Sequence, residues 1–299
     1  MSDIIIPHLK LNEESTGTFL RRAARSRKFI IGAVILILLV VPALLAPWFS
    51  RYDPLYVDPT ITFQPPSWAH WMGTDNIGRD IWARFLFGGR VSMLVGVIAM
   101  SISSTIGTLA GITAGFYGKW VDSILSWFTE VLMAFPGILL AMAVISILGP
   151  GLTNVMVAVG IGSIPSFMRM ARSSVMKVEQ MEYIEAARSI GCRDTRLLFR
   201  HILPNILNPL IMLVTLGVGG AILEGAAFNF LGLGAQPPAP EWGSMLSAGR
   251  GFLNQGWWIS IFPGLGIFLA ILGFNLLGDG LTEILDPHTN NTLNSHQAD

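Results

Sequence analysis

Two carboxylates lie within or beside long uncharged stretches of this sequence. Glu130 precedes the run from Val131 to Met168, which holds no charged residue, and Glu224 lies in the apolar segment AILEGAAFNFLGLG. A carboxylate at membrane depth is energetically costly, so such a residue is a candidate for binding a proton, a metal cation or a cationic group of a solute. The structural alternative is a hydrogen bond to a neighbouring helix or to a partner subunit. We expect Glu224, together with Asn229, to line a polar pathway through the apolar region, and Glu130 to lie at the membrane interface.

A second group of charged residues is concentrated in EYIEAARSIGCRDTRLLFRHILPN, residues 182–205. Apolar residues recur every three positions over 178–190, which predicts a helix with one apolar face. We expect Gly191 to end this helix in a left-handed conformation, and Asp194 to cap a second short helix that runs through Arg200. Pro204 suits the entry to the next helix, where a missing N–H costs little. A solvated loop needs neither the apolar face nor the bend, so the segment predicts a docking surface for a cytoplasmic partner.

The sequence shows no other constellation that supports catalysis, metal binding or nucleotide binding. The five histidines are scattered, Cys192 is the only cysteine, and no nucleophile–base pair is apparent. The phosphate-loop pattern G-x-x-x-x-G-K-[ST] is absent. The formal net charge of zero gives no electrostatic basis for nucleic-acid binding. The sequence therefore predicts neither an enzyme nor a metal site, and any ATP hydrolysis would take place in another chain.

Membrane-spanning helices must position these residues. Only 13% of the chain is charged and 52% is hydrophobic, whereas a soluble domain carries about 25% charged residues. A span needs about 20 mostly apolar residues, and six stretches qualify, two of them separated by Gly149-Pro150-Gly151. The expected spans are Phe29–Trp48, Val91–Gly115, Ser123–Leu148, Leu152–Met170, Asn205–Leu231 and Trp257–Leu277.

Basic residues are unevenly distributed between the two sides of the predicted bundle. Of the 19 lysines and arginines, 14 fall on the side of the N-terminus, so the positive-inside rule places both termini and the charged segment in the cytoplasm. The expected organisation is a cytoplasmic tail (1–28), a first helix (29–50), an outer segment (51–90), a core (91–287) with a cytoplasmic loop at 171–204, and a cytoplasmic tail (288–299).

The expected outer segment carries three charged residues close together, Asp75, Arg79 and Asp80. We expect them to form a cluster that contacts a partner, the alternative being a solvated helix start. Further along the chain, Ala235–Trp242 is too rich in proline for a helix, and we expect a capping or re-entrant turn there.

Small residues recur four positions apart in the second and fifth predicted spans. Residues with this spacing lie on one helix face and allow another helix to approach closely. They predict close packing within a helix bundle. The residues are Ser103, Gly107, Gly111 and Gly115 in one span, and Gly217, Ala221 and Gly225 in the other.

The spacing within the charged segment matches a known pattern. Glu185-Ala186-Ala187 is followed after three residues by Gly191, and the pair Leu203-Pro204 begins twelve residues after that glycine. This arrangement resembles the cytoplasmic EAA loop of bacterial ABC-importer permeases, although His201 replaces the isoleucine that usually lies three residues before the proline. Three further segments are similar to the dipeptide/oligopeptide/nickel permeases, so that the resemblance covers nearly the whole chain. They are WMGTDNIGRDIWARFLFGGRVSMLVG, LGLGAQPPAPEWGSML and FNLLGDGLTEILDP.

This resemblance implies the shorter, six-span permease of a heteromeric pair. The fold would be an all-α membrane bundle with one extra N-terminal helix and a five-helix core. The implied partners are a second, homologous permease, two ATPase subunits that bind ATP and magnesium, an extracytoplasmic solute-binding protein and membrane lipid. The implied location is the bacterial or archaeal inner membrane. Di- or oligopeptides are the first expectation for the substrate, with glutathione or nickel chelates as alternatives.

The resemblance also assigns roles within the EAA loop. The helix would insert into a cleft of the ATPase, where Glu185 and Arg188 make polar contacts and Ala186 and Ala187 allow close approach. Gly191 would supply the bend. The joint at Leu203-Pro204 would pass the displacement to the fifth span, which shifts the bundle between its inward- and outward-facing states.

A different class of transporter is the main competing hypothesis. An ion-coupled secondary transporter would use Glu130 and Glu224 as proton or sodium sites. Such folds usually carry inverted repeats with broken spans in matching halves, and this sequence shows no corresponding halves. A membrane scaffold without transport activity would leave the EAA spacing unexplained.

Overall fold

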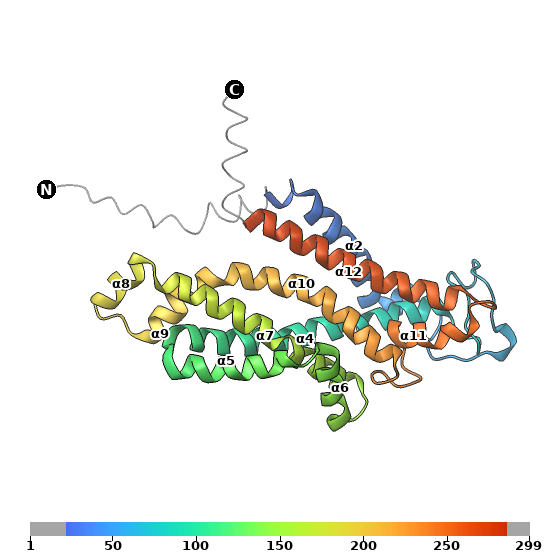
Figure 1. The fold of residues 1–299 in the computed structure, drawn as a ribbon. Coiled ribbons are helices and arrows are strands. Elements are labelled where there is room, and N and C mark those ends of the chain that lie inside the picture. The colour runs from blue at the N-terminus through green and yellow to red at the C-terminus, as the bar shows by residue number, and fades with distance from the viewer. Residues whose placement is uncertain (1–21, 286–299) are drawn as a thin grey trace.

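The computed structural model describes residues 22–285 as helices joined by turns, without any strand longer than an isolated bridge in that range (Figure 1). The expected C-terminal tail, 288–299, and most of the expected N-terminal tail, 1–28, lie outside the described residues. Five helices are long and apolar enough to cross a membrane. They are α2 (Arg27–Leu44), α4 (Ile81–Tyr117), α7 (Leu152–Glu179), α10 (Leu203–Phe230) and α12 (Trp258–Leu285).

A sixth span is available if the bent pair α5 (Lys119–Ala134) and α6 (Gly137–Leu148) crosses the membrane as one unit. We expected a single helix over Ser123–Leu148, and the structure corrects this: α5 and α6 are bent by 94°. Pro136 causes the break, because it lacks an N–H and disfavours the helical conformation of the residue before it. Phe135 accordingly has extended dihedral angles.

The shorter elements lie between the spans and at their ends. They are α3 (Ala46–Phe49), η1 (Pro59–Ile61), α8 (Glu182–Ser189), α9 (Asp194–Arg196), a π-helix η2 (Leu197–Ile202), α11 (Trp242–Gly249) and η3 (Arg250–Phe252). Residues 232–241 form turns before α11, which confirms that the proline-rich stretch is not helical.

Three helix boundaries differ from the sequence expectation by eight residues or more, and one of them is the end of α12, which continues to Leu285 rather than Leu277. Helix α4 begins at Ile81, ten residues before the expected start at Val91, because the Asp80 carboxylate caps it by accepting a hydrogen bond from the Ala83 amide at 2.7 Å. Helix α7 continues to Glu179, nine residues beyond the expected end. The apolar pattern over 178–190 is therefore divided between α7 and α8 by a turn.

The close contact between α4 and α7 organises the core. A Cβ atom on Gly107 would lie 2.6 Å from Phe167 Cβ and 2.7 Å from the Ile164 carbonyl oxygen, so the two helices approach nearly to backbone contact. In the same contact, the Ser103 hydroxyl donates a hydrogen bond to the Gly160 carbonyl at 2.7 Å. The small residues of α10 face α4, where Gly225 meets Val95. The prediction of close intramolecular packing is thus confirmed.

Helix α2 lies outside this core. It packs along α12 (Figure 1), and few of its residues are buried. Gly32 permits the contact, since a Cβ atom there would be 2.8 Å from the Gly273 carbonyl oxygen of α12. This arrangement agrees with one additional N-terminal helix beside a five-helix core.

We predict that Gly107→Ala lowers the free energy of unfolding by about 1–3 kcal/mol, because the added methyl group forces α4 and α7 apart. The matched control is Gly162→Ala in α7, where a Cβ atom would meet nothing within 4 Å. It should be neutral or stabilising, since alanine favours the helix. Thermal unfolding of the purified protein in detergent checks both variants, and equal melting temperatures for the two would contradict the proposed packing.

Candidate functional site

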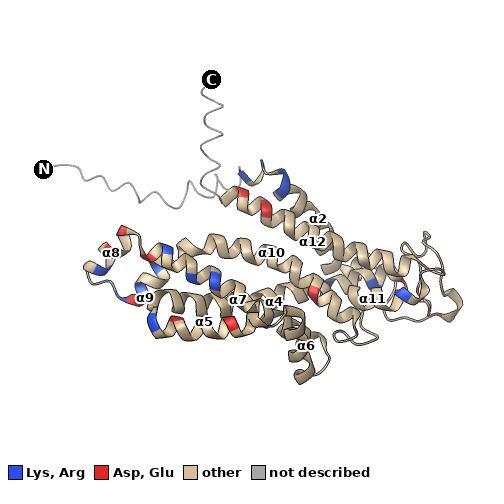
Figure 2. Ribbon diagram, viewed as in Figure 1, with Lys and Arg blue, Asp and Glu red and all other residues tan. Residues whose placement is uncertain are grey.

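Charged side chains gather at one end of the bundle, around α8 and α9, whereas the long helices are almost uncharged between their ends (Figure 2). We call this the α8 end. The other end, which carries α11 and residues 50–80, we call the α11 end. Three groups of predicted site residues are therefore separated in space: the EAA segment, the charged residues that precede α4, and the polar residues of α10.

The bend after α8 is built by a specific hydrogen-bonding pattern. Gly191 has φ = +81°, its N–H donates to the Arg188 carbonyl at 2.9 Å, and the Cys192 N–H donates to the Ala187 carbonyl at 3.1 Å. This pair of bonds around a left-handed glycine is the Schellman arrangement that ends many helices. The predicted conformation of Gly191 is confirmed.

Three contacts fix α8 to the membrane-spanning helices. Ile184 is completely buried. The Tyr183 hydroxyl accepts a hydrogen bond from the Asn205 side chain of α10 at 3.1 Å. Arg188 forms an ion pair with Glu179 and lies over the Phe116 ring at 5.4 Å from its centroid. Arg188, for which we expected a contact in an ATPase cleft, is thus already engaged within its own chain.

The side of α8 that points away from the bundle is free of such contacts. Glu185 and Ala186 are exposed, and Ala187 is half-buried. Ile190, the residue before the bend, is 86% exposed. Together these residues give the outer side of α8 a mixed charged and apolar surface that the rest of the described chain leaves uncovered. We call the exposed residues Glu185, Ala186 and Ile190 the docking face.

The connection from α8 to α10 differs in detail from the expectation. Asp194 is the first residue of α9 rather than its cap, and α9 ends at Arg196. The chain continues as the π-helix η2, whose residues Leu197 and Ile202 are completely buried. Pro204 lies in the first turn of α10, as predicted. A π-helix is rare and is often found at functional sites, because its wider turn is easily rearranged.

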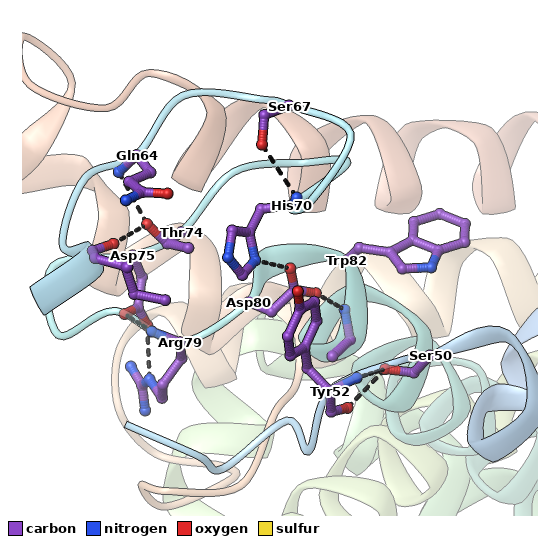
Figure 3. Close-up of polar contacts among 12 residues, drawn as sticks. Ser50, Tyr52, Gln64, Ser67, His70, Thr74, Asp75, Arg79, Asp80 and Trp82 are labelled. Atoms are coloured by element: carbon purple, nitrogen blue, oxygen red, sulfur yellow. Dashed lines mark hydrogen bonds and ion pairs between the residues drawn. The ribbon is translucent and has the colours of Figure 1, made fainter. Parts of the chain in front are cut away.

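The charged residues before α4 form two internal pairs (Figure 3). Arg79 Nε donates to Asp75 Oδ2 at 2.6 Å, and the other Asp75 oxygen accepts from the Arg79 backbone N–H at 2.9 Å. Asp80 pairs with His70, whose Nδ1 lies 2.9 Å from Asp80 Oδ1. Tyr52 stacks on the His70 ring at 4.7 Å.

These pairs correct the expectation of one charge cluster that contacts a partner. Asp75 and Asp80 are only 3% and 4% exposed, so their carboxylates serve the fold of this segment and are not available to another protein. No local pattern indicates the histidine, since His70 lies ten residues before Asp80 in an irregular stretch.

The two predicted pathway residues of α10 lie in different environments. Glu224 is exposed on the helix surface, and it forms no ion pair with any residue in the described part of the chain. Asn229 is buried, and its side-chain oxygen accepts a hydrogen bond from the Ala235 N–H at 2.7 Å. Asn229 therefore holds the turn after α10 rather than reaching a surface that a solute could touch. Glu130 of α5 is also exposed.

A carboxylate that sequence analysis did not single out connects α4 and α11. Glu241 is 1% exposed and accepts hydrogen bonds from the Ser92 hydroxyl at 2.7 Å and from the Ser244 N–H at 2.8 Å. Its neighbour Trp242 is equally buried and donates from Nε1 to the Phe85 carbonyl at 2.9 Å. No local signal could reveal the first bond, because Ser92 and Glu241 are 149 residues apart.

We predict that Gly191→Val weakens the end of α8, whereas Gly191→Asn does not. A side chain at this position would meet nothing within 4 Å, so the cost arises from the left-handed backbone conformation alone. That cost is about 1–2 kcal/mol for most residues and smaller for asparagine. Hydrogen exchange of residues 182–196 should therefore accelerate by about tenfold in the valine variant. Equal exchange in the two variants would show that the left-handed conformation does not govern this helix end.

Comparisons with known proteins agree with this geometry. The family described as binding-protein-dependent transport system inner membrane component matches residues 107–291. The N-terminal transmembrane domain of oligopeptide transport permease C matches residues 16–66. In structure, the chain resembles a methionine ABC transporter, MetNI, in an inward-facing conformation, with a TM-score of 0.53 and 17% identity over 67% of this chain and 95% of that one. This likeness shows the fold alone.

Two groups of curated relatives align along almost their full length. The dipeptide transport system permease protein DppC of Alkalihalophilus pseudofirmus is 44% identical over 267 residues, 89% of this chain and 88% of that protein. The glutathione transport system permease protein GsiD of Escherichia coli is 46% identical over 270 residues, 90% of this chain and 89% of that protein. With its helical bundle, its EAA segment and these matches, the chain belongs to the binding-protein-dependent transport system inner membrane components, the permease subunits of ABC importers.

Proposed function

We propose that this permease subunit forms half of an import pathway for di- or oligopeptides, with glutathione as the second candidate substrate. The observation that carries the proposal is the identity of 44–46% along nearly the whole chain to permeases named for dipeptide and for glutathione transport. Glutathione is itself a small peptide, so both candidates share an amide backbone and charged ends. Nickel chelates, the third expectation from sequence, have no support among these relatives.

The docking face of α8 is the proposed contact with an ATPase subunit. Glu185, Ala186 and Ile190 are exposed there, while Ile184, on another side of the same short helix, is buried against the bundle. A partner that covers this face can move α8, and the contacts of α8 with α4, α7 and α10 would carry that movement into the membrane. In this proposal Arg188 positions α8 from within the chain, while its half-exposed side chain stays open to the polar contact expected in the ATPase cleft.

The proposed orientation places the α8 end in the cytoplasm. ATP is available there, and basic residues are concentrated at that end. The α11 end would then face the extracytoplasmic solute-binding protein. The second, homologous permease would complete the pathway along the membrane-spanning surface.

Glu224 is the proposed polar contact within that pathway. An exposed carboxylate is not stable against hydrocarbon, so the surface of α10 that carries Glu224 must face water, a solute or another subunit. A peptide brings a cationic amino terminus that such a carboxylate would attract. Gly220, one turn before it, leaves open space on this side of the helix.

We predict that Ala186→Arg abolishes uptake of a labelled dipeptide and releases the ATPase subunits, because a long charged side chain prevents close approach at the docking face. The matched control is Ser123→Arg in α5, at an exposed residue at the same end of the bundle. This variant should retain both peptide uptake and the ATPase subunits. Uptake into cells that make the full transporter, combined with co-purification, provides the measurement. Retained ATPases in the Ala186 variant would refute the docking assignment.

The same uptake assay tests the substrate. Labelled dipeptide and labelled glutathione are supplied in parallel to the wild-type transporter. Uptake of the dipeptide is expected, whereas uptake of glutathione alone would identify the second candidate as the substrate. If neither compound is taken up by the wild-type transporter, the peptide proposal fails even though membership of the family stands.

We further predict that Glu224→Gln lowers uptake about tenfold, the loss expected when one charge-assisted hydrogen bond is removed, while the ATPase subunits remain bound. Leu223→Gln, at the neighbouring exposed position, is the control and should retain most of the uptake. Normal uptake by Glu224→Gln would exclude a direct solute contact. Loss of the partner permease from this variant would instead assign Glu224 to the subunit interface.

A further inference from the structure

A cavity of about 480 Å³ lies at the α11 end, between the end of α10, the segment α11–η3 and the beginning of α12. Its walls are apolar except for Arg250 and Ser260. The EAA segment and Glu224 do not line it, so neither the docking face nor the proposed pathway contact accounts for it.

The cation in this cavity has no anionic partner in residues 22–285. Arg250 lies over the Phe230 ring, with 5.4 Å between the guanidinium carbon and the ring centroid, and no carboxylate of the described chain is within ion-pair distance. By contrast, Arg79 at the same end of the bundle has a carboxylate partner, and Arg84 donates to backbone carbonyls. Arg250 therefore presents free hydrogen-bond donors at the edge of an apolar hollow.

A second polar group at the cavity also lacks a partner. Ser260 is 5% exposed, and its hydroxyl has no hydrogen-bond partner in the structure. Its oxygen is packed against Gly249 of α11, where a Cβ atom would come within 2.4 Å of it, so it lies behind the lining of the cavity. Arg250 is therefore the polar group that would bind an anionic or oxygen-rich ligand.

The apolar side of the cavity continues along the surface of α12. Ile261, Leu265 and Phe268 are each about half exposed, and their spacing of four and three residues places them on one helix face. They cover about 10 Å of the helix axis. Trp257, immediately before α12, is also half exposed and is typical of the level where lipid headgroups meet water. A cation at that level, followed by an apolar stripe along α12, can bind a molecule that has an anionic headgroup and an apolar chain.

We propose that this cavity binds a membrane phospholipid, with its headgroup phosphate on Arg250 and one acyl chain along Ile261, Leu265 and Phe268. Guanidinium groups bind phosphate oxygens through two parallel hydrogen bonds, and the apolar lining suits an acyl chain better than the polar backbone of a peptide. The lipid completes the contacts of η3 with α10 and α12. The proposal depends on the chain being embedded in a membrane and is independent of which solute it transports.

The floor of the cavity provides a substitution that tests this proposal without disturbing the fold. A Cβ atom on Gly264 would meet only Leu246 Cδ1, at 3.8 Å, and leucine favours a helix more than glycine does. Gly264→Leu therefore fills the cavity while the surrounding chain stays in place. Arg250→Gln removes the charge and leaves the cavity open. The matched controls are Gly162→Leu, in open space on α7, and Arg51→Gln, a cation at the same end that lies over Trp71.

The measurement is native mass spectrometry of the complete transporter, titrated in mild detergent with phosphatidylglycerol and with diacylglycerol that carries the same acyl chains. The number of tightly bound phosphatidylglycerol molecules per transporter should be one higher in the wild type and in both controls than in Gly264→Leu. Arg250→Gln should bind that lipid about tenfold more weakly, the effect of one charge-assisted hydrogen bond. Diacylglycerol should bind weakly to every protein, since it has no phosphate.

Three results would overturn the proposal. The first is equal phosphatidylglycerol binding by the wild type, Arg250→Gln and Gly264→Leu. The second is dissociation of the partner permease from Gly264→Leu, which would make the cavity a protein interface. The third is a raised KM for peptide uptake in Arg250→Gln with unchanged lipid binding, which would assign Arg250 to a carboxylate of the solute.

Discussion

The near backbone contact of α4 with α7 is the constraint on which the rest of the molecule depends. In a bilayer, apolar side chains gain little by contacting one another rather than lipid, so helices associate through close packing of small residues. Gly107 and Ser103 provide that packing. Helix α4 begins at the charged pairs of the α11 end, and α7 ends beside α8. The two helices therefore form one rigid unit that joins the opposite ends of the protein.

The attachment of α8 to this unit has consequences for how movement would be transmitted. On one side Arg188 connects α8 to Glu179 of α7 and to Phe116 of α4. On the other side the chain reaches α10 through a π-helix, an element that is rare and frequent at functional sites. The sequence-based expectation passes the displacement to α10 through the joint at Leu203-Pro204, and the contacts of Arg188 add a second connection, to the α4–α7 unit.

Sequence analysis succeeded where the signal is local. The apolar lengths identified the spans, the spacing of glycines identified the helix contacts, and the EAA pattern with Gly191 identified the bend after α8. It failed where two contacting residues are distant in sequence, and where a structural break leaves no trace in the composition. Hydropathy does not register the break at Pro136, because the residues directly before and after it are apolar. Likewise, nothing near Asp80 indicates that its carboxylate pairs with His70, although the alternative of a helix start at this cluster agrees with the cap that Asp80 forms on α4.

Two carboxylates illustrate how a structure separates support from function. Sequence draws attention to Glu224 because its neighbours are apolar, and passes over Glu241 because a proline-rich turn surrounds it. In the structure Glu241 is the buried one. Burial raises its pKa, and the hydrogen bonds from Ser92 and from backbone N–H groups oppose that rise. The Glu241 oxygens therefore accept hydrogen bonds from donors of the same chain. Glu224 is exposed and has no ion-pair partner among the described residues. Of the two carboxylates, Glu224 is therefore the one for which a contact outside the described residues is proposed.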